Sequence, residues 1–168
     1  MNYLYELGHR KIAHIAGDET IDAGAARING YELAMQELDL PIRPGYLVNA
    51  GFFSVEEGKQ AMEQLLELAD QPTAVFVAGD QMAIGVIEAI HEHGLHVPND
   101  ISVIGYDDIE MIQYITPKLT TIRQDTDEIG EAAAELLLEQ MTAKERLTER
   151  RVIPVRLVER ASCAPVKQ

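Results

Sequence analysis

The amino-acid sequence predicts an α/β protein in which a parallel sheet is flanked by helices. Short apolar segments of strand length alternate along the chain with longer segments whose apolar residues recur at helical spacing. The 168 residues are 46% hydrophobic and 25% charged, which is the composition of an ordinary globular protein. Proline, glycine and capping residues separate the segments. Strands that alternate with helices in this way form βαβ units, and such units build parallel sheets.

In the first half of the chain, we expect strands at 12–16, 46–48 and 74–77. Between the first two strands, apolar residues recur at helical spacing, which predicts a helix with one buried face: Ile28, Tyr31, Met35 and Leu38. Ser54 and Glu57 have the spacing of a capping box, so a second helix is expected to begin there.

The second half continues the alternation. A helix is expected from about residue 80 to residue 93, with Gly94 after its end, and extended segments follow at 101–104 and 119–122. A second capping signal at 125–128 opens a helix with an apolar stripe: Ile129, Ala133, Leu136, Leu137 and Met141. A last strand is expected at 152–158, at an edge of the sheet or at a crossing point because it contains Pro154.

Charge and motif content argue against several classes of function. The 14 Lys and Arg residues against 28 Asp and Glu residues give a net charge of −14, which repels nucleic-acid phosphates. Cys163 is the single cysteine, so no internal disulfide can form. The N-terminal residues have neither a basic region nor a long apolar run, so we expect a cytoplasmic protein without a membrane anchor. The sequence lacks a phosphate-binding glycine loop and a nucleophile elbow, and no cofactor or catalytic residue is predicted.

The candidate site follows from the predicted parallel sheet, because ligands of such sheets bind beyond the carboxyl ends of the strands. Polar and aromatic residues follow four of the predicted strands, and one arginine of the first helix faces the same edge: Asp18, Phe52–Phe53, Gly79–Asp80, Tyr106–Asp108 and Arg27.

Three interpretations of these residues remain open on spacing alone. Asp107 and Arg27 can hold the hydroxyls of a sugar while Phe53 contacts an apolar ring face. Alternatively, Asp80, Asp107 and Asp108 are the acidic cluster of a metal-dependent enzyme. In the third interpretation, Asp80 caps a helix and the other two acids are ordinary turn residues.

A histidine cluster near the end of the 80–93 helix could be a metal clip, but histidines two apart do not share a helix face. We therefore favour a solvated helix end for His91, His93 and His96, and predict no metal site.

Seven motifs in a fixed order resemble one known family. They are LGHRKIA at 7–13, RINGY at 27–31, PTAVF at 72–76, DQMAIG at 80–85, VPNDISVIGYDD at 97–108, PKLTTI at 117–122 and LVERAS at 157–162. Over residues 4–162, the chain resembles the effector-binding core of the lactose-repressor/galactose-repressor (LacI/GalR) family of bacterial transcription regulators.

The resemblance implies a periplasmic-binding-protein-like core of two Rossmann-like subdomains with an effector between them. Arg27 and Asp107 match the family's two recurrent ligand-gripping positions, and Phe53 matches a position where some members stack an aromatic ring on the ligand. Asp80 completes the predicted ligand-binding set. Gly79 stands where the lactose-repressor type has a sugar-contacting Asn, and Ile21 stands where purine-binding members have a second Arg, which argues against a purine effector.

The resemblance also predicts how the chain is divided. Residues 1–122 would form the C-terminal effector-binding subdomain, 123–153 a returning part of the N-terminal subdomain, 154–162 the final strand of the C-terminal subdomain, and 163–168 a tail. Family members begin with a helix-turn-helix headpiece that this chain does not contain. We therefore expect a fragment or a truncated gene product, with operator DNA bound only through the missing headpiece.

The functional prediction is the effector-binding and dimerisation core of such a regulator, with a sugar or sugar derivative as effector. The alternatives are a periplasmic-type sugar-binding protein of a transport system and the metal-dependent enzyme. We expect a homodimer, with the apolar stripe of the 125–141 helix either folded back on its own chain or covered by a second copy. The side chain of Asp108 is expected to face solvent.

Overall fold

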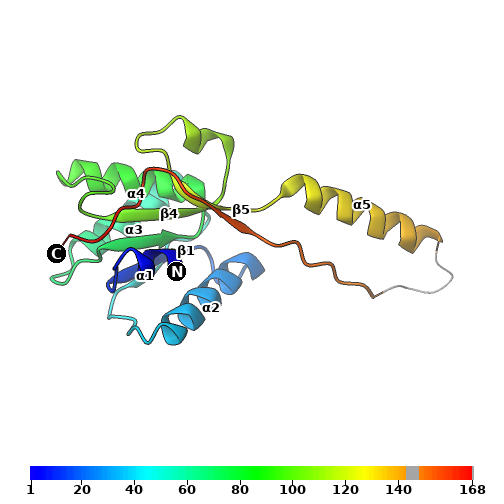
Figure 1. The fold of residues 1–168 in the computed structure, drawn as a ribbon, viewed down its shortest axis with the longest axis horizontal. Helices are drawn as coiled ribbons and strands as arrows, with labels where there is room; N and C mark the ends of the chain where they lie inside the picture. Colours follow the sequence, from blue (N-terminus) through cyan, green and yellow to red (C-terminus); the bar gives the residue numbers. More distant parts are fainter. Residues whose placement is uncertain (143–147, 168) are drawn as a thin grey trace.

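A computed structural model describes residues 1–142 and 148–167 of the chain. The body is a sheet with helices on both faces, and one helix projects from the body (Figure 1). The helices are α1 (Asn2–Glu6), α2 (Asp22–Glu37), α3 (Val55–Leu66), α4 (Asp80–Glu92) and α5 (Thr126–Thr142), with a 3-10 turn η1 (Glu110–Gln113). The strands are β1 (Ile12–Ala16), β2 (Leu47–Asn49), β3 (Ala74–Val77), β4 (Ser102–Asp107), β5 (Thr120–Arg123) and β6 (Arg156–Val158).

The six strands lie in the order β2-β1-β3-β4-β5-β6. The first five are parallel, which confirms the predicted α/β class, and β6 pairs antiparallel with β5 at the edge of the sheet. The strand predicted at 152–158 is shorter than expected, because only Arg156–Val158 joins the sheet. Pro154 lies before this strand, as expected for a residue without an N–H to donate to the ladder.

Local sequence signals place the helix ends as expected. The Ser54 hydroxyl accepts the N–H of Glu57 at 3.2 Å while the Glu57 carboxylate accepts the N–H of Ser54 at 3.0 Å, which completes the capping box of α3. Gly94 follows α4 with φ of +75°, a conformation that glycine adopts without strain. Asp125 accepts the N–H of Glu128 at 3.3 Å at the start of α5.

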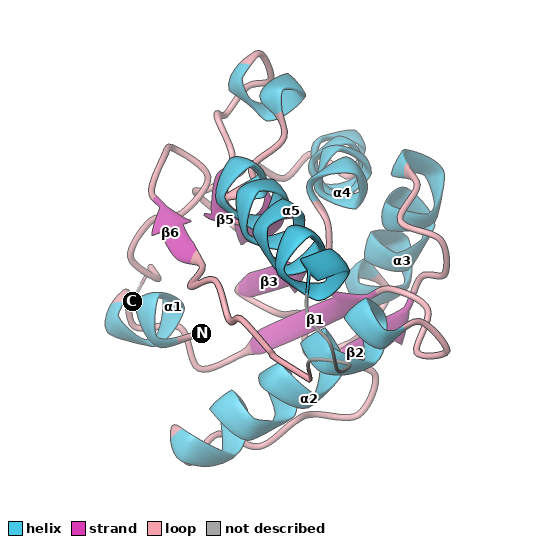
Figure 2. Cartoon of the chain, turned by 90° about the vertical axis from the view of Figure 1, so that its right-hand side faces the viewer, coloured by secondary structure: helices cyan, strands magenta, loops and turns pink. Residues whose placement is uncertain are grey.

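Two apolar layers hold the body together, one on each face of the sheet. Figure 2 shows the sheet with helices on both of its sides. One layer packs α3 and α4 against the sheet, and the other packs α1 and α2 against the opposite face. The α3–α4 contact is close: a Cβ at Gly58 would lie 2.2 Å from the carbonyl oxygen of Met82. On the other face, the Tyr31 hydroxyl of α2 donates to the carbonyl of Ile12 at 2.9 Å.

Helix α5 stands apart from the body, and none of its residues is buried. Ile129, Leu137, Leu138 and Met141 are 41%, 62%, 62% and 73% exposed. The returning segment lies along the helix, where Arg151 pairs with Glu135 at 2.5 Å. Of the two arrangements left open for the apolar stripe, folding back onto its own subdomain is therefore not found, because α1–α4 already cover both faces of the sheet. The segment predicted at 123–153 includes residues 143–147, which lie outside the described residues.

Within residues 1–142 and 148–167, no helix is both long enough and apolar enough to cross a membrane.

A buried histidine lies on β1 between the sheet and α2. The ring of His14 stacks on Phe76 with centroids 4.7 Å apart and lies 5.1 Å from the Tyr31 ring. Its Nδ1 donates to the Phe76 carbonyl at 2.9 Å, so the unprotonated Nε2 faces the core, where no group in the described chain hydrogen-bonds to it. Burial lowers the pKa of His14 from 6.5 to about 4, so the folded protein keeps this ring neutral.

This arrangement predicts acid sensitivity. The unfolded chain binds a proton at His14 below pH ~6.5 whereas the folded protein does so only near pH 4, so the stability from the neutral ring falls as pH falls through that window. We expect His14→Phe to remove about 3 kcal/mol of pH dependence between pH 7 and 4. Urea unfolding at several pH values measures it. The exposed-histidine control His93→Gln should keep the wild-type slope, and a His14→Phe curve parallel to wild type would contradict the assignment.

Candidate ligand-binding site

The carboxyl ends of the parallel strands meet at the edge of the sheet from which α5 departs (Figure 1). A cavity of about 480 Å³ lies at this edge. It brings together three of the four predicted ligand-binding residues, and its lining consists of Ala23, Arg27, Phe53, Gly79, Gln81, Asp107 and Ile109.

Arg27 reaches this cavity from the second turn of α2. One terminal nitrogen donates to the Ala78 carbonyl at 2.5 Å, and the other lies 3.4 Å from Oδ1 of Asp107. The guanidinium lies 4.0 Å from the centroid of the Tyr106 ring and 5.5 Å from that of Phe53. The side chain is 14% exposed. These contacts hold the guanidinium in place before any ligand arrives, which reduces the entropy that binding would otherwise cost.

Asp107 is the last residue of β4 and has φ of +110°. Its Oδ1 accepts the side-chain amide of Gln124 at 2.7 Å as well as the Arg27 contact. Burial raises the pKa of Asp107, while Arg27 and Gln124 act in the opposite direction. The side chain is still 34% exposed, so the carboxylate can accept hydrogen bonds from hydroxyls in the cavity.

Sequence reasoning missed Gln124, although the signal that identified Asp107 applies to it equally. Gln124 directly follows β5, as the other candidates follow their strands. Gln81, which lines the cavity from α4, was also missed.

The Phe53 ring fits against the backbone of two glycines. A Cβ at Gly17 would lie 2.0 Å from Cζ of Phe53, and a Cβ at Gly79 would lie 3.1 Å from Cδ1. Phe53 itself has φ of +66°, which is uncommon for an aromatic residue. Gly17 and Gly79 therefore make room for the ring, which forms one wall of the cavity.

Asp80 is fully buried beneath the turn that follows β4. Its carboxyl group accepts the Thr121 hydroxyl at 2.6 Å and the N–H of Ile109 at 3.0 Å. Burial raises the pKa of Asp80 to about 6, and these hydrogen bonds oppose the increase. The N-cap of α4 is Gly79, so the capping role considered for Asp80 is wrong. Asp80 is not one of the residues that line the cavity. It contributes indirectly, because it hydrogen-bonds to Ile109, which does line the cavity.

The expectation that Asp108 faces solvent is also wrong. Its side chain is 0% exposed and pairs with both Arg123 and Arg160. Arg160 lies 52 positions away along the chain, so no local pattern identifies this partner. The three aspartates have different bonding partners: Asp80 binds Thr121 and Ile109, Asp107 binds Arg27 and Gln124, and Asp108 binds two arginines. This arrangement does not suit the acidic cluster of a metal-dependent enzyme.

The remaining candidates lie outside the cavity. Asp18 accepts the N–H and the hydroxyl of Thr20 at 2.8 and 2.6 Å, and these bonds lower its pKa. Phe52 is 74% exposed. His93 donates to the Ala89 carbonyl at 2.9 Å, and His96 lies 3.6 Å from Asp100. In the part of the chain that the structure describes, no three His, Cys, Asp or Glu side chains are placed to hold a metal.

A larger cavity of about 710 Å³ lies on the α1–α2 face of the sheet and shares Arg27 with the first. Its walls are mainly aromatic and aliphatic and include Tyr31, Phe76, Tyr106 and Ile122.

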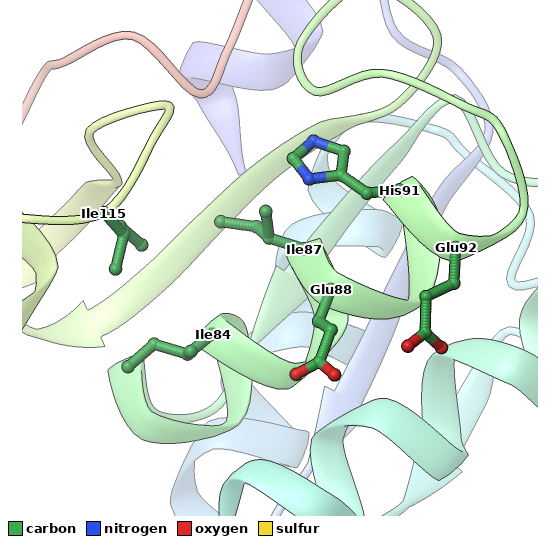
Figure 3. A pocket seen from close by; sticks show the side chains of 6 residues that line it. All are labelled: Ile84, Ile87, Glu88, His91, Glu92 and Ile115. Carbon is green, nitrogen blue, oxygen red and sulfur yellow. The ribbon is translucent and has the colours of Figure 1, made fainter.

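A shallow apolar depression lies on the outer side of α4, and sequence reasoning missed it. Figure 3 shows Ile84, Ile87 and His91 on α4 with Ile115 from the segment after η1. Glu88 and Glu92 border the depression, and Lys59 of α3 binds them at 3.0 and 2.8 Å. The segment that carries Ile115 also exposes two large apolar side chains, Met111 (57%) and Tyr114 (77%).

Comparison with known proteins gives consistent matches. Residues 1–163 match the model of a periplasmic binding protein-like domain. The HTH-type transcriptional repressor PurR of Klebsiella pneumoniae is 44% identical over 162 residues, which cover 96% of this chain and 47% of the repressor. A LacI family regulator from Enterococcus faecium, solved with bound ribose, is 38% identical with a TM-score of 0.84, covering 98% of this chain and 60% of that one. A dimeric lac repressor is 34% identical with a TM-score of 0.90, covering 98% and 59%.

The buried Asp80 predicts a pH dependence of stability opposite to that of His14: this carboxyl group should stabilise the fold more at low pH. Because the folded state raises the pKa of this carboxyl from 3.8 to about 6, its stabilising contribution is complete below pH ~4 and is lost as pH rises through 6. Relative to Asp80→Asn, wild type should gain about 3 kcal/mol of unfolding free energy between pH 7 and pH 4. Chemical denaturation across this range measures the difference.

Asp100→Asn is a suitable control, because Lys167 lowers the pKa of that exposed carboxylate and the slope should have the opposite sign. If the difference in unfolding free energy between wild type and Asp80→Asn did not vary with pH, the folded state would not raise the pKa of Asp80, and the prediction would be wrong.

Proposed function

Because this chain belongs to the family of periplasmic binding protein-like domains, we propose that it is the effector-binding core of a LacI/GalR-type transcription regulator. The family resemblance noted from the sequence is confirmed by this match and by the repressor relatives and LacI-type structures. The chain spans about half the length of the relatives it matches, 47% for the repressor from Klebsiella pneumoniae. The activity of a whole regulator is therefore part of the proposal.

The observation that carries this proposal is the cavity in which Arg27, Asp107 and Phe53 converge. A guanidinium and a half-buried carboxylate can donate to and accept from neighbouring hydroxyls, and an aromatic wall suits the apolar face of a sugar ring. We propose a sugar or sugar derivative as effector. The Enterococcus faecium regulator with bound ribose supports this ligand class.

A purine base is the second ligand to test, since repressors named PurR are among the relatives. Ile21, the residue in the place of the second Arg of purine-binding members, is the N-cap residue of α2 and is 40% exposed. An isoleucine there offers no hydrogen bond to a base, so the residues favour the sugar.

The regulatory mechanism we propose is a population shift. An effector that binds one arrangement of the two subdomains better than the other changes how paired headpieces meet DNA. In this scheme residues 1–122 and 154–162 form the effector-binding subdomain, 123–153 belong to the neighbouring subdomain, 163–168 are a tail, and operator DNA is bound by a headpiece outside this chain. We assign no catalytic step, because the relatives are repressors and not enzymes.

A periplasmic-type sugar-binding protein is the rival function, because it would use the same kind of cavity. The relatives found here are repressors, which favours the regulator. A helix-turn-helix segment encoded immediately upstream of Met1 would distinguish the two functions.

We also propose that the chain forms a homodimer through the apolar depression on α4. Isoleucines at 84, 87 and 115 line the depression. The segment that carries Ile115 also exposes Met111 and Tyr114, and exposed apolar side chains of this size normally mark a contact when they form a patch. A two-fold interface places each helix against its copy, so one patch serves both subunits.

Effector binding should depend on Asp107. We expect D-ribose or D-galactose, titrated to millimolar concentration, to shift the amide NMR signals of Arg27, Asp107 and Gln124. Asp107→Asn should weaken binding about 30-fold or more, the loss expected when a hydrogen bond to a charged group is removed from a partly buried site.

Asp100→Asn, at an exposed ion pair with Lys167, is the matched control and should bind as wild type does. Unchanged affinity in Asp107→Asn would remove this residue from the site. Hypoxanthine shifting the same signals while both sugars fail would replace the sugar with a purine.

Dimerisation should depend on the outer face of α4. Ile84→Glu places a charge in the depression and should convert the dimer to an 18.6 kDa monomer near ~50 μM, because an unpaired charge is costly in an apolar interface. Light scattering measures the mass. Leu33→Glu, on an exposed position of α2, is the control and should remain dimeric. A wild-type monomer, or equal masses for both variants, would contradict the proposed interface.

A further inference from the structure

The chain leaves the body at the end of β5 to form α5 and returns at the start of β6 (Figures 1 and 2). Since no residue of α5 is buried, contacts between α5 and the body do not fix its direction. We call the end of β5 and the start of β6, where the chain leaves and re-enters the body, the two crossings. The direction of α5 is set at these crossings, where β5 and β6 pair with Arg123 opposite Arg156. We call α5 together with residues 148–155 the arm.

One carboxylate ties both crossings to the end of β4. Oδ2 of Asp108 accepts from Arg123, the last residue of β5, and Oδ1 accepts from Arg160 at 2.5 Å, two residues beyond β6. Arg160 is anchored further, because its other terminal nitrogen donates to the Leu119 carbonyl at 2.7 Å and its N–H donates to the Thr120 hydroxyl at 2.9 Å. We call Asp108, Arg123 and Arg160 the clamp.

The clamp depends on the negative charge of Asp108. Asp108 is 0% exposed, and the side chains of Arg123 and Arg160 are 36% and 13% exposed. Without the carboxylate, two guanidiniums would face each other at the point where the crossings meet, and one of them is largely shielded from water. Removing one member of a buried charge pair is costly for this reason, so the crossings should separate or rotate.

The clamp is continuous with the candidate ligand site. Asp107 binds Gln124 while the next residue, Asp108, binds Arg123, so two consecutive residues of one strand end hold two consecutive residues of the other. Both aspartates have positive φ, +110° and +60°, and such conformations persist only where the surroundings impose them. The clamp and the contact that holds the cavity carboxylate therefore share one turn.

We propose that Asp108, through Arg123 and Arg160, is a positioning residue that couples the Asp107 cavity to the direction of the arm. A ligand that takes hydrogen bonds from Asp107 or Gln124 acts on the same turn that the clamp holds. The inference rests on the proposed function only in calling the cavity an effector site, since the mechanical link exists without ligand.

Asp108→Asn tests the link because asparagine keeps the shape of the side chain and tolerates the left-handed region while it removes the charge. In hydrogen–deuterium exchange, amides in 121–126 and 156–161 should exchange about tenfold faster or more, as expected for the loss of charged hydrogen bonds. The amides of α3 should not change. The side-chain amide NMR signal of Gln124, assigned with Gln124→Glu, should move as its bond to Asp107 loosens.

Asp70→Asn is the matched control, because Asp70 also binds two cations, Lys11 and Arg43, but on an exposed surface near the start of β1. It should leave both crossing segments and the Gln124 signal as in wild type. Wild-type exchange at the crossings in Asp108→Asn, or an unmoved Gln124 signal, would overturn the proposal.

Single-sided variants keep the proposal testable if Asp108→Asn does not fold. Arg123→Gln should accelerate exchange mainly in 121–126, and Arg160→Gln mainly in 156–161. Equal effects of both variants on both segments, or none, would show that the cluster is only general support for the fold. Failure of sugars to bind while these results hold would count against the proposed function and not against the clamp.

Discussion

At the end of β4, two consecutive aspartates adopt positive φ angles of +110° and +60°, and side chains from several elements hold them there. Asp80 accepts the N–H of Ile109 from beneath, Arg27 and Gln124 hold Asp107, and two arginines hold Asp108. A strained residue costs on the order of 1–3 kcal/mol, so the surrounding bonds must supply that energy. The cavity depends on this turn, because the turn presents the carboxylate of Asp107 to it.

The parallel sheet explains why these groups meet. Strands that run in one direction bring their carboxyl ends to the same edge, and residues far apart in sequence become neighbours there. Arg27 then serves two purposes with one guanidinium, since it binds the Ala78 carbonyl and lies beside Asp107. A ligand that enters the cavity meets a charged pair already oriented by the fold, which is the condition for recognising a polar molecule without a large ordering cost.

Helix α5 differs from the other helices because none of its residues is buried. Its exposed apolar residues would be stabilised by roughly 25 cal/mol for each Å² buried, and such a stripe is the mark of a contact surface. The direction in which this stripe points is set at the crossings of β5 and β6. A carboxylate held there by two arginines links that direction to the turn that forms the cavity.

Local patterns in the sequence determined the elements and the edge that carries the site. Periodicity placed the strands and helices, and Ser54 and Glu57 placed a helix start. The strand ends predicted Phe53 and Asp107 as candidates, the early turns of the first helix predicted Arg27, and all three line one cavity. Only the tertiary structure decided that the Asp108 side chain is buried between two arginines, that Asp80 is buried outside the cavity lining, that β6 runs antiparallel, and that no residue of α5 is buried. The reason is that periodicity and capping act over a few residues, whereas the partner of a charge depends on where distant strands cross.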